Sequence, residues 1–558
     1  MTKPFSDADT VLYGLDLESR QMVIDTVRAL RSKLLSKEVI LSFDKDEVFP
    51  EETIRQMLGP EIGLQLIFLP EAYGGMGGGA RDCCAVTREM ARICLGVGTA
   101  FFAIQLGADP IIVGGTQAQK EKWLGTIAEG TSLVAYAVTE PGAGSNLAAL
   151  KTKAEPISDE DGQVTGYRIN GTKQFISTGG FADFVTVLAK APEGPSFFIV
   201  EKGAQGFDQG KGEEKHGIRA SNTSPLSFRD VVVPKENLVG GIPGKGLKQA
   251  NKVFGYTRLM VASMALGAAE AALDIAIQYA KERIQFGAPL SEKQGYTHKL
   301  IVPHAVRLEA AAAYIEEMAA EVDRDVHKDV QVEGSIAKLF TTESANKAAD
   351  DAIQALGGYG YISEYEVEKI KRDVKITCIY EGTSEIQQNI ISTYRWKITR
   401  KTKGAFYDNI RAEMETLGRS LNNGGCELLG HSARILNEAI GQVHDNRLTR
   451  QQYIMFALAN LMAHVEVGAS LARKANGLAE NGHAGAEKYR AMSRIFAHEV
   501  AQLAATTIPL VLVGTGLFEP KEMAVYLQKL DHAAMMLGYD HIITEMDGVA
   551  DILFERKT

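Results

Sequence analysis

The pattern of hydrophobic and polar positions divides the chain into helical and β-rich regions. From about 8 to 130, apolar residues recur every three or four positions, as in SRQMVIDTVRALRSKLL, which is typical of amphipathic helices. From about 133 to 240, short β-rich runs such as DFVTVLAKA and SFFIVEK are separated by Gly, Pro and Asn turns. Alanine-rich helical sequence returns after GGIPGKGLKQ and continues to the C-terminus. The pattern therefore predicts helical, β, helical and helical regions in that order.

We expect a mainly α fold with a central β domain. The predicted domains are an N-terminal helical domain (1–130), a middle β domain (131–240), a helical bundle (241–400) and an additional C-terminal helical domain (401–558). With 558 residues, of which 45% are hydrophobic, the chain is long enough to form several separate cores.

A weak repeat links the last two regions at an offset of 156 residues. It pairs Phe340 with Phe496 and Glu343 with Glu499, and it also aligns two glycines of GGYG with two of VGTG. Four matches in alanine-rich sequence are compatible either with duplication or with chance. If the repeat is real, Leu510 and Leu537 stand in the second copy where the first has Gln354 and Glu381, so the second copy is structural.

Charge and cysteine content exclude several classes of function. The chain has 60 Lys and Arg against 70 Asp and Glu, a net charge of −10, which argues against a nucleic acid as the main partner. Its five cysteines have no CxxC spacing, so neither a disulfide framework nor a metal site is indicated. A cytoplasmic location fits best. The N-terminus lacks an apolar export segment, and runs such as IPLVLVGTGLF are shorter than the roughly 20 residues a bilayer requires, so we expect no membrane span.

Seven stretches carry a family resemblance, and they occur in the family's order and spacing: LPEAYGGMGGGARD, YAVTEPGAGSN, NGTKQFIS, FRDVVVP, RIQFGAPLSEKQ, QALGGYGYISEYEVEKIKRD and IYEGTSEIQ. Together they resemble the acyl-CoA dehydrogenase flavoproteins over about residues 8–400. Residues 401–558 resemble, more weakly, the extra helical domain of the very-long-chain branch. The resemblance implies FAD as cofactor, an acyl-CoA substrate and an N-terminal helical, middle β-barrel-like and C-terminal helical-bundle layout.

The glutamate of IYEGTSEIQ is the predicted catalytic residue. Dehydrogenation of a thioester needs a base for the α-proton and a cofactor that accepts a hydride, since no amino acid does. A carboxylate desolvated among apolar neighbours has a raised pKa and is a better base near neutral pH. On spacing alone, Glu381 is also compatible with a carboxylate at a helix N-terminus. With the flanking motifs it is similar to the family's base, and the family's alternative base position holds Thr257 here.

The resemblance also implies a cofactor site built from several motifs. Arg283, Gln294, Gln354 and Gly358 match family residues that reach the FAD of the neighbouring subunit. Phe175 and Ser177 stand where the family usually has a tryptophan and a threonine beside the flavin. The full predicted set for the cofactor is Tyr136, Val138, Thr139, Gly144, Ser145, Phe175, Ile176, Ser177, Arg283, Phe286, Gln294, Gln354, Gly357, Gly358, Thr383 and Glu385.

A second set is predicted to contact the acyl-CoA. It consists of Ser145, Phe101, Phe102, Arg258, Tyr380 and Gly382. Gly382 lets the substrate approach the backbone, where an N–H group of the turn can polarise the thioester carbonyl. The wall LGVGTAFFAIQLG contains no arginine, which disfavours acyl groups with a second carboxylate.

Partners and alternatives complete the hypothesis. The resemblance implies electron transfer to an electron-transfer flavoprotein, and it implies dimers of dimers that meet through their C-terminal helical domains. Because 401–558 can pack where the second dimer would sit, we expect a homodimer, with a tetramer as the alternative. One alternative function is an acyl-CoA oxidase, in which oxygen reaches the reduced flavin. Another is a DNA-associated alkylation-response flavoprotein of the same family, but 401–558 holds 16 Lys and Arg against 18 Asp and Glu and lacks a basic surface for DNA.

Overall fold

The computed structural model describes residues 13–556 except 327, 423, 530 and 537–539. Its N-terminal region is helical, and Asp16 begins the first helix by accepting a hydrogen bond from the Ser19 N–H at 2.8 Å. Leu537, the repeat position equivalent to Glu381, lies outside the described residues. The helices of this region are α1 (Leu17–Lys33), α2 (Lys37–Lys45), α3 (Glu51–Leu58), α4 (Ala80–Gly114), α5 (Gln117–Gln119) and α6 (Gly125–Ala128).

Helix α4 is interrupted in its middle. Cys94 has φ −161° and ψ 114°, which is not helical. The segment after this break carries the predicted acyl wall, and both Phe101 and Phe102 are buried in it. Helix α7 (Gly246–Glu282) packs along α4, so the acyl wall faces the helix that contains Thr257 and Arg258.

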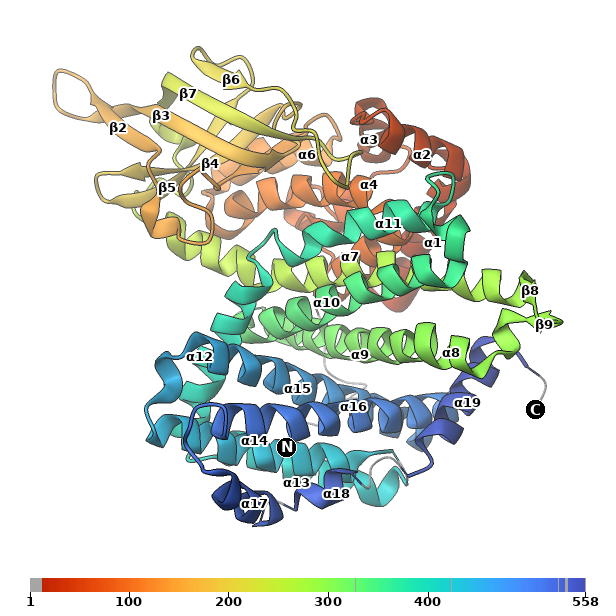
Figure 1. The fold of residues 1–558 in the computed structure, drawn as a ribbon. Coiled ribbons are helices and arrows are strands. Elements are labelled where there is room, and N and C mark those ends of the chain that lie inside the picture. The colour runs from red at the N-terminus through yellow and green to blue at the C-terminus, as the bar shows by residue number, and fades with distance from the viewer. Residues whose placement is uncertain (1–12, 327, 423, 530, 537–539, 557–558) are drawn as a thin grey trace.

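The middle region forms one seven-stranded sheet, which Figure 1 shows at the top of the molecule. Strand β4 is apolar and buried along nearly all its length because neighbours cover it on both faces. The sheet has its own core, which includes Tyr167, Phe198 and Phe228. The strand order is β1-β4-β2-β3-β7-β6 with β5 paired to β4. The strands are β1 (Val134–Ala137), β2 (Lys153–Ser158), β3 (Val164–Ser177), β4 (Phe184–Ala191), β5 (Gly194–Glu201), β6 (Phe207–Gln209) and β7 (Thr223–Pro234).

A helical bundle follows the sheet and lies at the centre of Figure 1. Its long helices are rich in alanine and pack closely, and α7 lies against both α4 and α10. A two-stranded hairpin projects from its far end. After α7 its elements are β8 (Ile284–Gln285), β9 (Ala288–Pro289), α8 (Gln294–Leu300), α9 (Val302–Arg324), α10 (Gln331–Leu356), α11 (Glu366–Val374) and α12 (Ser384–Lys401).

The C-terminal extension is a second helical layer beneath the bundle (Figure 1). Its helices recur at the offset of the sequence repeat. Adding 156 to the bounds of α10 gives 487–512, which matches α16, and α9 shifted in the same way ends at residue 480, where α15 ends. The helices are α13 (Ala405–Ser420), α14 (Cys426–Asp445), α15 (Gln452–Glu480), α16 (Ala486–Leu512), α17 (Pro520–Lys529), α18 (His532–Met536) and α19 (Ile542–Leu553).

Equivalent positions of the two copies meet each other. The rings of Phe340 and Phe496 are 5.4 Å apart in an edge-on arrangement. Glu317 and Arg473, which are also 156 residues apart, form an ion pair at 2.9 Å. Residues related by the repeat can touch only near a local two-fold axis, so the extension is placed on the bundle as one half of a pseudo-symmetric pair.

A buried ion pair joins the two layers. Arg395 on α12 donates to both carboxylate oxygens of Glu466 on α15, at 2.8 and 2.7 Å, and also to Glu333 at 2.9 Å. The side chains of Arg395 and Glu466 are almost fully buried. Because a buried charge is costly without its partner, this contact fixes the extension in one orientation.

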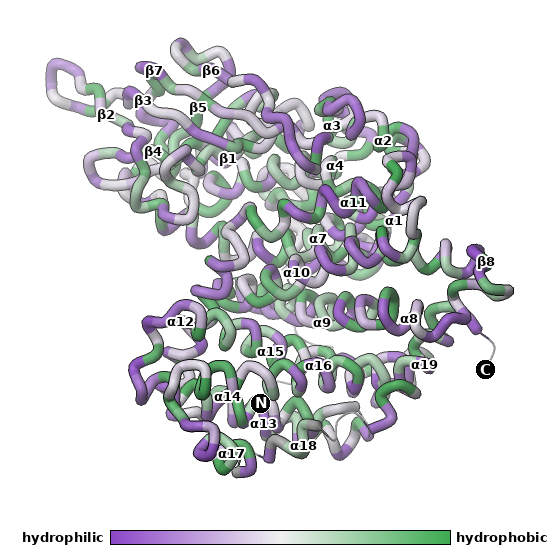
Figure 2. Tube along the Cα trace, viewed as in Figure 1, coloured by the Kyte–Doolittle hydropathy of each residue, from purple (hydrophilic) through white to green (hydrophobic). Residues whose placement is uncertain are grey.

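The structure corrects the expectation that no apolar segment is long enough for a membrane. By length and composition, α4, α7, α15 and α16 qualify. Uninterrupted apolar runs underestimated them because small and weakly polar residues keep these helices apolar over many turns. Between 67 and 89% of their most apolar windows is buried in the protein, and Figure 2 shows these helices through the interior of the fold.

Candidate active site

The turn that carries Glu381 connects the end of α11 to α12. Glu381 has φ 55° and Gly382 has φ 91°, so two successive residues adopt the left-handed region. Thr383 then caps α12 by accepting from the Ile386 N–H at 3.4 Å. A non-glycine residue in this region is strained, and such strain concentrates at functional sites. The turn therefore aims the Glu381 side chain into the protein rather than along the surface of α12.

The Glu381 carboxylate lies among helices α7 and α10. The Thr257 hydroxyl donates to its Oε2 at 3.5 Å. Burial raises the pKa of Glu381, and the charges of Lys338 and then Arg258 oppose this rise. The carboxylate is thus desolvated as expected, but the charges of Lys338 and Arg258 act on it as well. Lys338 is not among the predicted site residues, because its signal in the sequence is only a lysine within the apolar pattern of α10.

Three of the predicted substrate residues, Arg258, Tyr380 and Gly382, lie in or beside this turn. Arg258 is buried, and its Nη1 donates to the Ser335 hydroxyl at 3.1 Å and to the Gln331 carbonyl at 3.3 Å. The hydroxyl of Tyr136 and the Nε of Arg258 are buried without a hydrogen-bond partner among the described residues. Buried polar groups rarely stay unsatisfied, so these atoms mark a place where a bound molecule completes the site.

Asp109 is a second carboxyl near the turn, at the end of the acyl-wall segment. Burial raises its pKa to about 8, and Tyr256 is its hydrogen-bond neighbour. Asp109 is therefore largely protonated at neutral pH. Asp109 lies two residues beyond LGVGTAFFAIQLG, the run that is predicted to form an apolar wall.

The loop after β1 supplies the predicted flavin contacts Val138, Thr139, Gly144 and Ser145. A buried ion pair between Lys173 and Glu140 holds this loop in place. Lys173 on β3 donates to the Val138 carbonyl at 3.0 Å and to Glu140 at 2.9 Å. Glu140 also accepts from the Lys151 and Thr152 N–H groups at 2.7 and 2.9 Å. The loop is thus held rigidly. Glu140 and Lys173 lie within YAVTEPGAGSN and NGTKQFIS, two motifs that supply other predicted flavin contacts.

Phe175 on β3 lies next to this loop, because the residue before it is hydrogen-bonded to the loop. The Gln174 N–H donates to the Thr139 carbonyl at 2.9 Å. Phe175 has φ 59° and is 64% exposed, whereas Ile176 is buried and Ser177 half-buried. A Cβ added at Gly144 would meet only the Thr139 methyl, at 3.9 Å. An exposed aromatic ring beside an open glycine loop fits a flat aromatic cofactor.

A second group of predicted residues lies far from the first. Arg283, Gln354, Gly357 and Gly358 line one cavity of about 550 Å³. Arg258 and Arg283 are 25 residues apart along α7, which corresponds to about 38 Å. Phe286, in the β8–β9 hairpin, is 98% exposed. The glycines and the arginine fit a phosphate-bearing group, but one chain does not bring them to its own Glu381.

The structure places Gln294 against the C-terminal extension. Its amide donates to the Asp547 carboxylate at 3.0 Å. Asp547 belongs to α19, which packs on α8, so the extension occupies this side chain. The other predicted residues of the second group have no such engagement with the extension among the contacts of the described residues.

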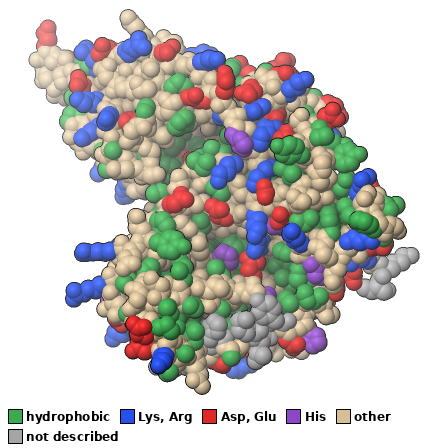
Figure 3. Space-filling model, viewed as in Figure 1, with side chains coloured by type: hydrophobic (Ala, Val, Ile, Leu, Met, Phe, Trp, Pro, Cys, Tyr) green, Lys and Arg blue, Asp and Glu red, His purple; other side chains and the backbone are tan. Residues whose placement is uncertain are grey.

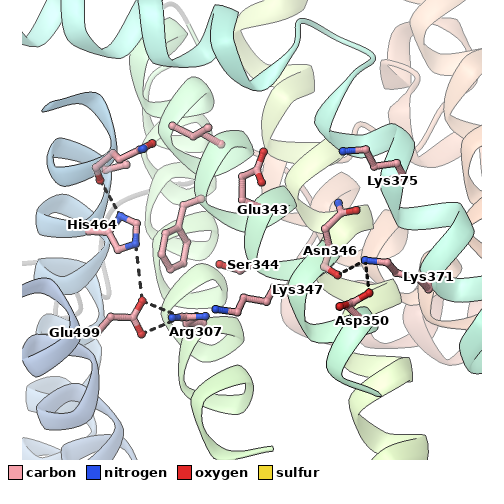
Figure 4. Close-up of a pocket in the computed structure, with 14 residues that line it drawn as sticks. Arg307, Glu343, Ser344, Asn346, Lys347, Asp350, Lys371, Lys375, His464 and Glu499 are labelled. Carbon is pink, nitrogen blue, oxygen red and sulfur yellow. Dashed lines mark hydrogen bonds and ion pairs between the residues drawn. The ribbon is translucent and has the colours of Figure 1, made fainter. Parts of the chain in front are cut away.

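A charged cleft of about 600 Å³ is lined by residues of both the bundle and the extension. Figure 3 shows basic, acidic and histidine side chains together along the middle of this face. Arg307 donates to both oxygens of Glu499 at 2.8 and 2.9 Å, and Lys371 pairs with Asp350 at 3.0 Å (Figure 4). Glu381 is not in its lining. The cleft lies where the two copies of the repeat meet.

The chain is similar to known proteins over most of its length. Three family models match consecutive parts of the chain: acyl-CoA dehydrogenase N-terminal domain at 18–131, middle domain at 135–231 and C-terminal domain at 244–394. A Bacillus subtilis (strain 168) acyl-CoA dehydrogenase is 41% identical over 357 residues, covering 63% of this chain and 91% of the relative.

Two further similarities concern the partner and the extension. The caffeyl-CoA reductase–Etf complex subunit CarC of Acetobacterium woodii is 36% identical over 382 residues, or 67% of this chain and 97% of its own. The crystal structure of an acyl-CoA dehydrogenase complexed with FAD from Bacillus anthracis superposes with a TM-score of 0.84 at 24% identity. It covers 99% of this chain and 96% of its own, so its fold includes a counterpart of the extension.

Proposed function

The chain belongs to the acyl-CoA dehydrogenase family, and we propose that it converts an acyl-CoA thioester to a 2-enoyl-CoA, with Glu381 as the base that removes the α-proton. The observation that carries the proposal is the left-handed turn that directs Glu381 between α7 and α10, where burial raises its pKa. A base with a raised pKa accepts a proton more effectively at neutral pH.

The chain's own groups divide the reaction between them. Bound FAD supplies the two-electron acceptor that no side chain can provide. The Glu381 carboxylate takes the α-proton, while the backbone N–H of Glu381, which has no acceptor among the described residues, is free to donate to the thioester carbonyl. Stabilising the negative charge that develops on that oxygen lowers the barrier to proton removal. The wall of α4 with Phe101 and Phe102 excludes water from the acyl group.

Two features support the proposed cofactor site. The loop held by Lys173 and the exposed ring of Phe175 suit the flavin, and the cavity at Arg283 suits the pyrophosphate and adenine. Because Arg258, beside Glu381, and Arg283 are about 38 Å apart along α7 in one chain, we propose that each FAD is bound by two subunits. The proposed electron acceptor is an electron-transfer flavoprotein, supported by the 36% identical relative that is named as a subunit of an Etf complex.

We further propose that the protein is a homodimer. The extension covers the bundle as a pseudo-symmetric copy, and the apolar side of α15 packs on α9. Related helices present related ridges, so the copy fills a surface that could otherwise bind a second dimer.

The test of the proposed base compares Glu381→Gln with Glu364→Gln, a control that removes an exposed carboxylate from the same segment. Both proteins are purified with FAD and mixed anaerobically with acyl-CoA thioesters of short to long, cyclic and aryl type. Wild type and Glu364→Gln should bleach the flavin band with at least one of them. Glu381→Gln should bind the same thioester and bleach roughly 10²- to 10⁴-fold more slowly, because only the proton acceptor is lost.

Near-normal bleaching by Glu381→Gln would place the base elsewhere. The same samples separate a dehydrogenase from an oxidase: a dehydrogenase reduces added electron-transfer flavoprotein and yields little peroxide in air, and an oxidase yields peroxide at each turnover.

A further inference from the structure

Lys338 is a fully buried lysine that touches the Glu381 turn. It lies in α10, its side chain has no solvent exposure, and its Nζ donates to the carbonyl oxygen of Gly382. The Gln387 amide donates to the same carbonyl at 2.8 Å and to the Glu381 carbonyl at 3.2 Å. The strained turn is therefore held by donors from two helices, one of which carries a positive charge.

Several ionisable groups surround the Glu381 carboxylate. Helix α10 contributes Lys338, and α7 contributes Arg258 together with the Thr257 hydroxyl. The α4 wall contributes Asp109, β1 contributes Tyr136, and the turn itself contributes Tyr380. Of these, only Lys338 and Arg258 carry a positive charge. Burial lowers the pKa of Lys338 to about 8, so its ammonium group is present over the acid side of the pH range.

The two cations are arranged differently. The Arg258 guanidinium is committed to Ser335 and to the Gln331 carbonyl at the start of α10. Lys338 instead donates to the residue that follows Glu381. Its charge is also the larger of the two influences that keep the Glu381 pKa from rising further. The contact thus holds the turn in place by a hydrogen bond and also brings a positive charge close to the Glu381 carboxylate.

We propose that Lys338 is a positioning residue for proton removal by Glu381: its ammonium group fixes the Glu381–Gly382 turn and keeps the carboxylate ionised in its desolvated site. This inference rests on the proposed role of Glu381 as the base. Proton transfer needs the carboxylate both deprotonated and within hydrogen-bond reach of the α-carbon proton, and Lys338 serves both needs without contacting substrate.

The experiment compares Lys338→Met, Lys338→Arg and Lys347→Met as FAD-loaded proteins. Lys347 is an exposed lysine on the same helix and is the matched control. Flavin content and thermal midpoint are recorded first. Then kcat and KM are measured from pH 5.5 to 9.5 with the best thioester and a dye acceptor, using unlabelled and α-deuterated substrate.

Lys338→Met should lower kcat roughly 10- to 100-fold with little change in KM, and it should move the acid limb of the pH profile upward by about one pH unit. The α-deuterium isotope effect on kcat should increase, because proton removal becomes slower relative to the other steps. Lys338→Arg keeps the charge and should restore the acid limb to its wild-type position while kcat stays below wild type. Lys347→Met should match wild type throughout.

Three results would overturn the inference. The first is a Lys338→Met protein with the kcat and acid limb of Lys347→Met. The second is a Lys338→Met protein whose kcat falls in proportion to its flavin content while the acid limb stays at the wild-type pH. That result would show a purely structural role for Lys338. The third applies if Lys338→Met does not fold. Lys338→Arg keeps the positive charge, so an acid limb in this variant that is shifted upward by about one pH unit would overturn the inference. A fully active Glu381→Gln would refute the proposed base itself, whereas an inactive Glu381→Gln beside a normal Lys338→Met refutes only the role of Lys338.

Discussion

The proposed FAD site spans two subunits, and Arg283 tests this directly. Arg283 is exposed at the end of α7, and no ion pair or side-chain hydrogen bond engages it within the described part of the chain. Its cavity is about 38 Å along α7 from Arg258, next to Glu381. Arg283→Ala should therefore weaken FAD binding in the partner's site while leaving its own fold intact.

The size of the effect follows from the contact that is lost. An arginine on a pyrophosphate makes charge-assisted hydrogen bonds, each contributing about 1.5 to 3 kcal/mol. Loss of this contact weakens FAD binding by roughly 10- to 150-fold. Arg447→Ala, an exposed arginine of the extension, is the control and should retain FAD normally. The measurement is the FAD fluorescence released on dilution of the purified proteins.

Subunit mixing then decides which chain the arginine serves. Arg283→Ala and Glu381→Gln are each nearly inactive at low FAD, and the two proteins are co-expressed with different tags so that the mixed dimer can be isolated. In that dimer one site combines a normal Glu381 with the partner's normal Arg283, and the other site has neither. The mixed dimer should have about half the wild-type activity per dimer, because one of its two sites is intact.

A mixed dimer as inactive as its parents would show that Arg283 acts on the FAD of its own chain. Unaltered FAD retention in Arg283→Ala would remove it from the cofactor site altogether. Either result would refute the two-subunit site, and neither would touch the assignment of Glu381.

Two further predictions concern assembly and pH. Light scattering should give a mass near twice 60.5 kDa, since the extension fills the surface where a second dimer would pack, and a version ending at residue 400 should associate further or aggregate; a mass near four times 60.5 kDa, or a soluble dimer of the shortened chain, would contradict this. Burial raises the pKa of Asp109 to about 8, so the folded protein keeps a proton that the unfolded chain releases near pH 4, and wild-type stability should fall as the pH rises toward 8. Relative to wild type, Asp109→Asn should gain on the order of 2 kcal/mol between pH 6 and pH 8, read from thermal midpoints at the two values, and parallel midpoints would show that Asp109 does not hold the proton.

Features that depend on residues close together in the sequence could be predicted from the sequence. Helical and strand periodicity gave the order of the regions, because each element buries one face whatever its partner is. The EG pair before Thr383 identified a turn at the start of α12, and the glycines of TEPGAGSN identified an open loop. The repeat at 156 residues was visible in a few side chains, and the bounds of α10 and α16 now show it as whole helices.

The periodicity of the sequence does not show which helices and strands pack against each other. Lys338 reads as an interior position of α10, but only the packing of α10 against the turn places its ammonium on the Gly382 carbonyl. Gln294 matches a cofactor motif, and only the fold of α19 shows that its amide also donates to Asp547. The sequence by itself determined the elements and the turn that carries Glu381, since these depend on local backbone preferences and on burial. The tertiary structure decided the charges around Glu381 and the separation of Arg283 from it, because contacts between distant residues arise from the packing of whole helices.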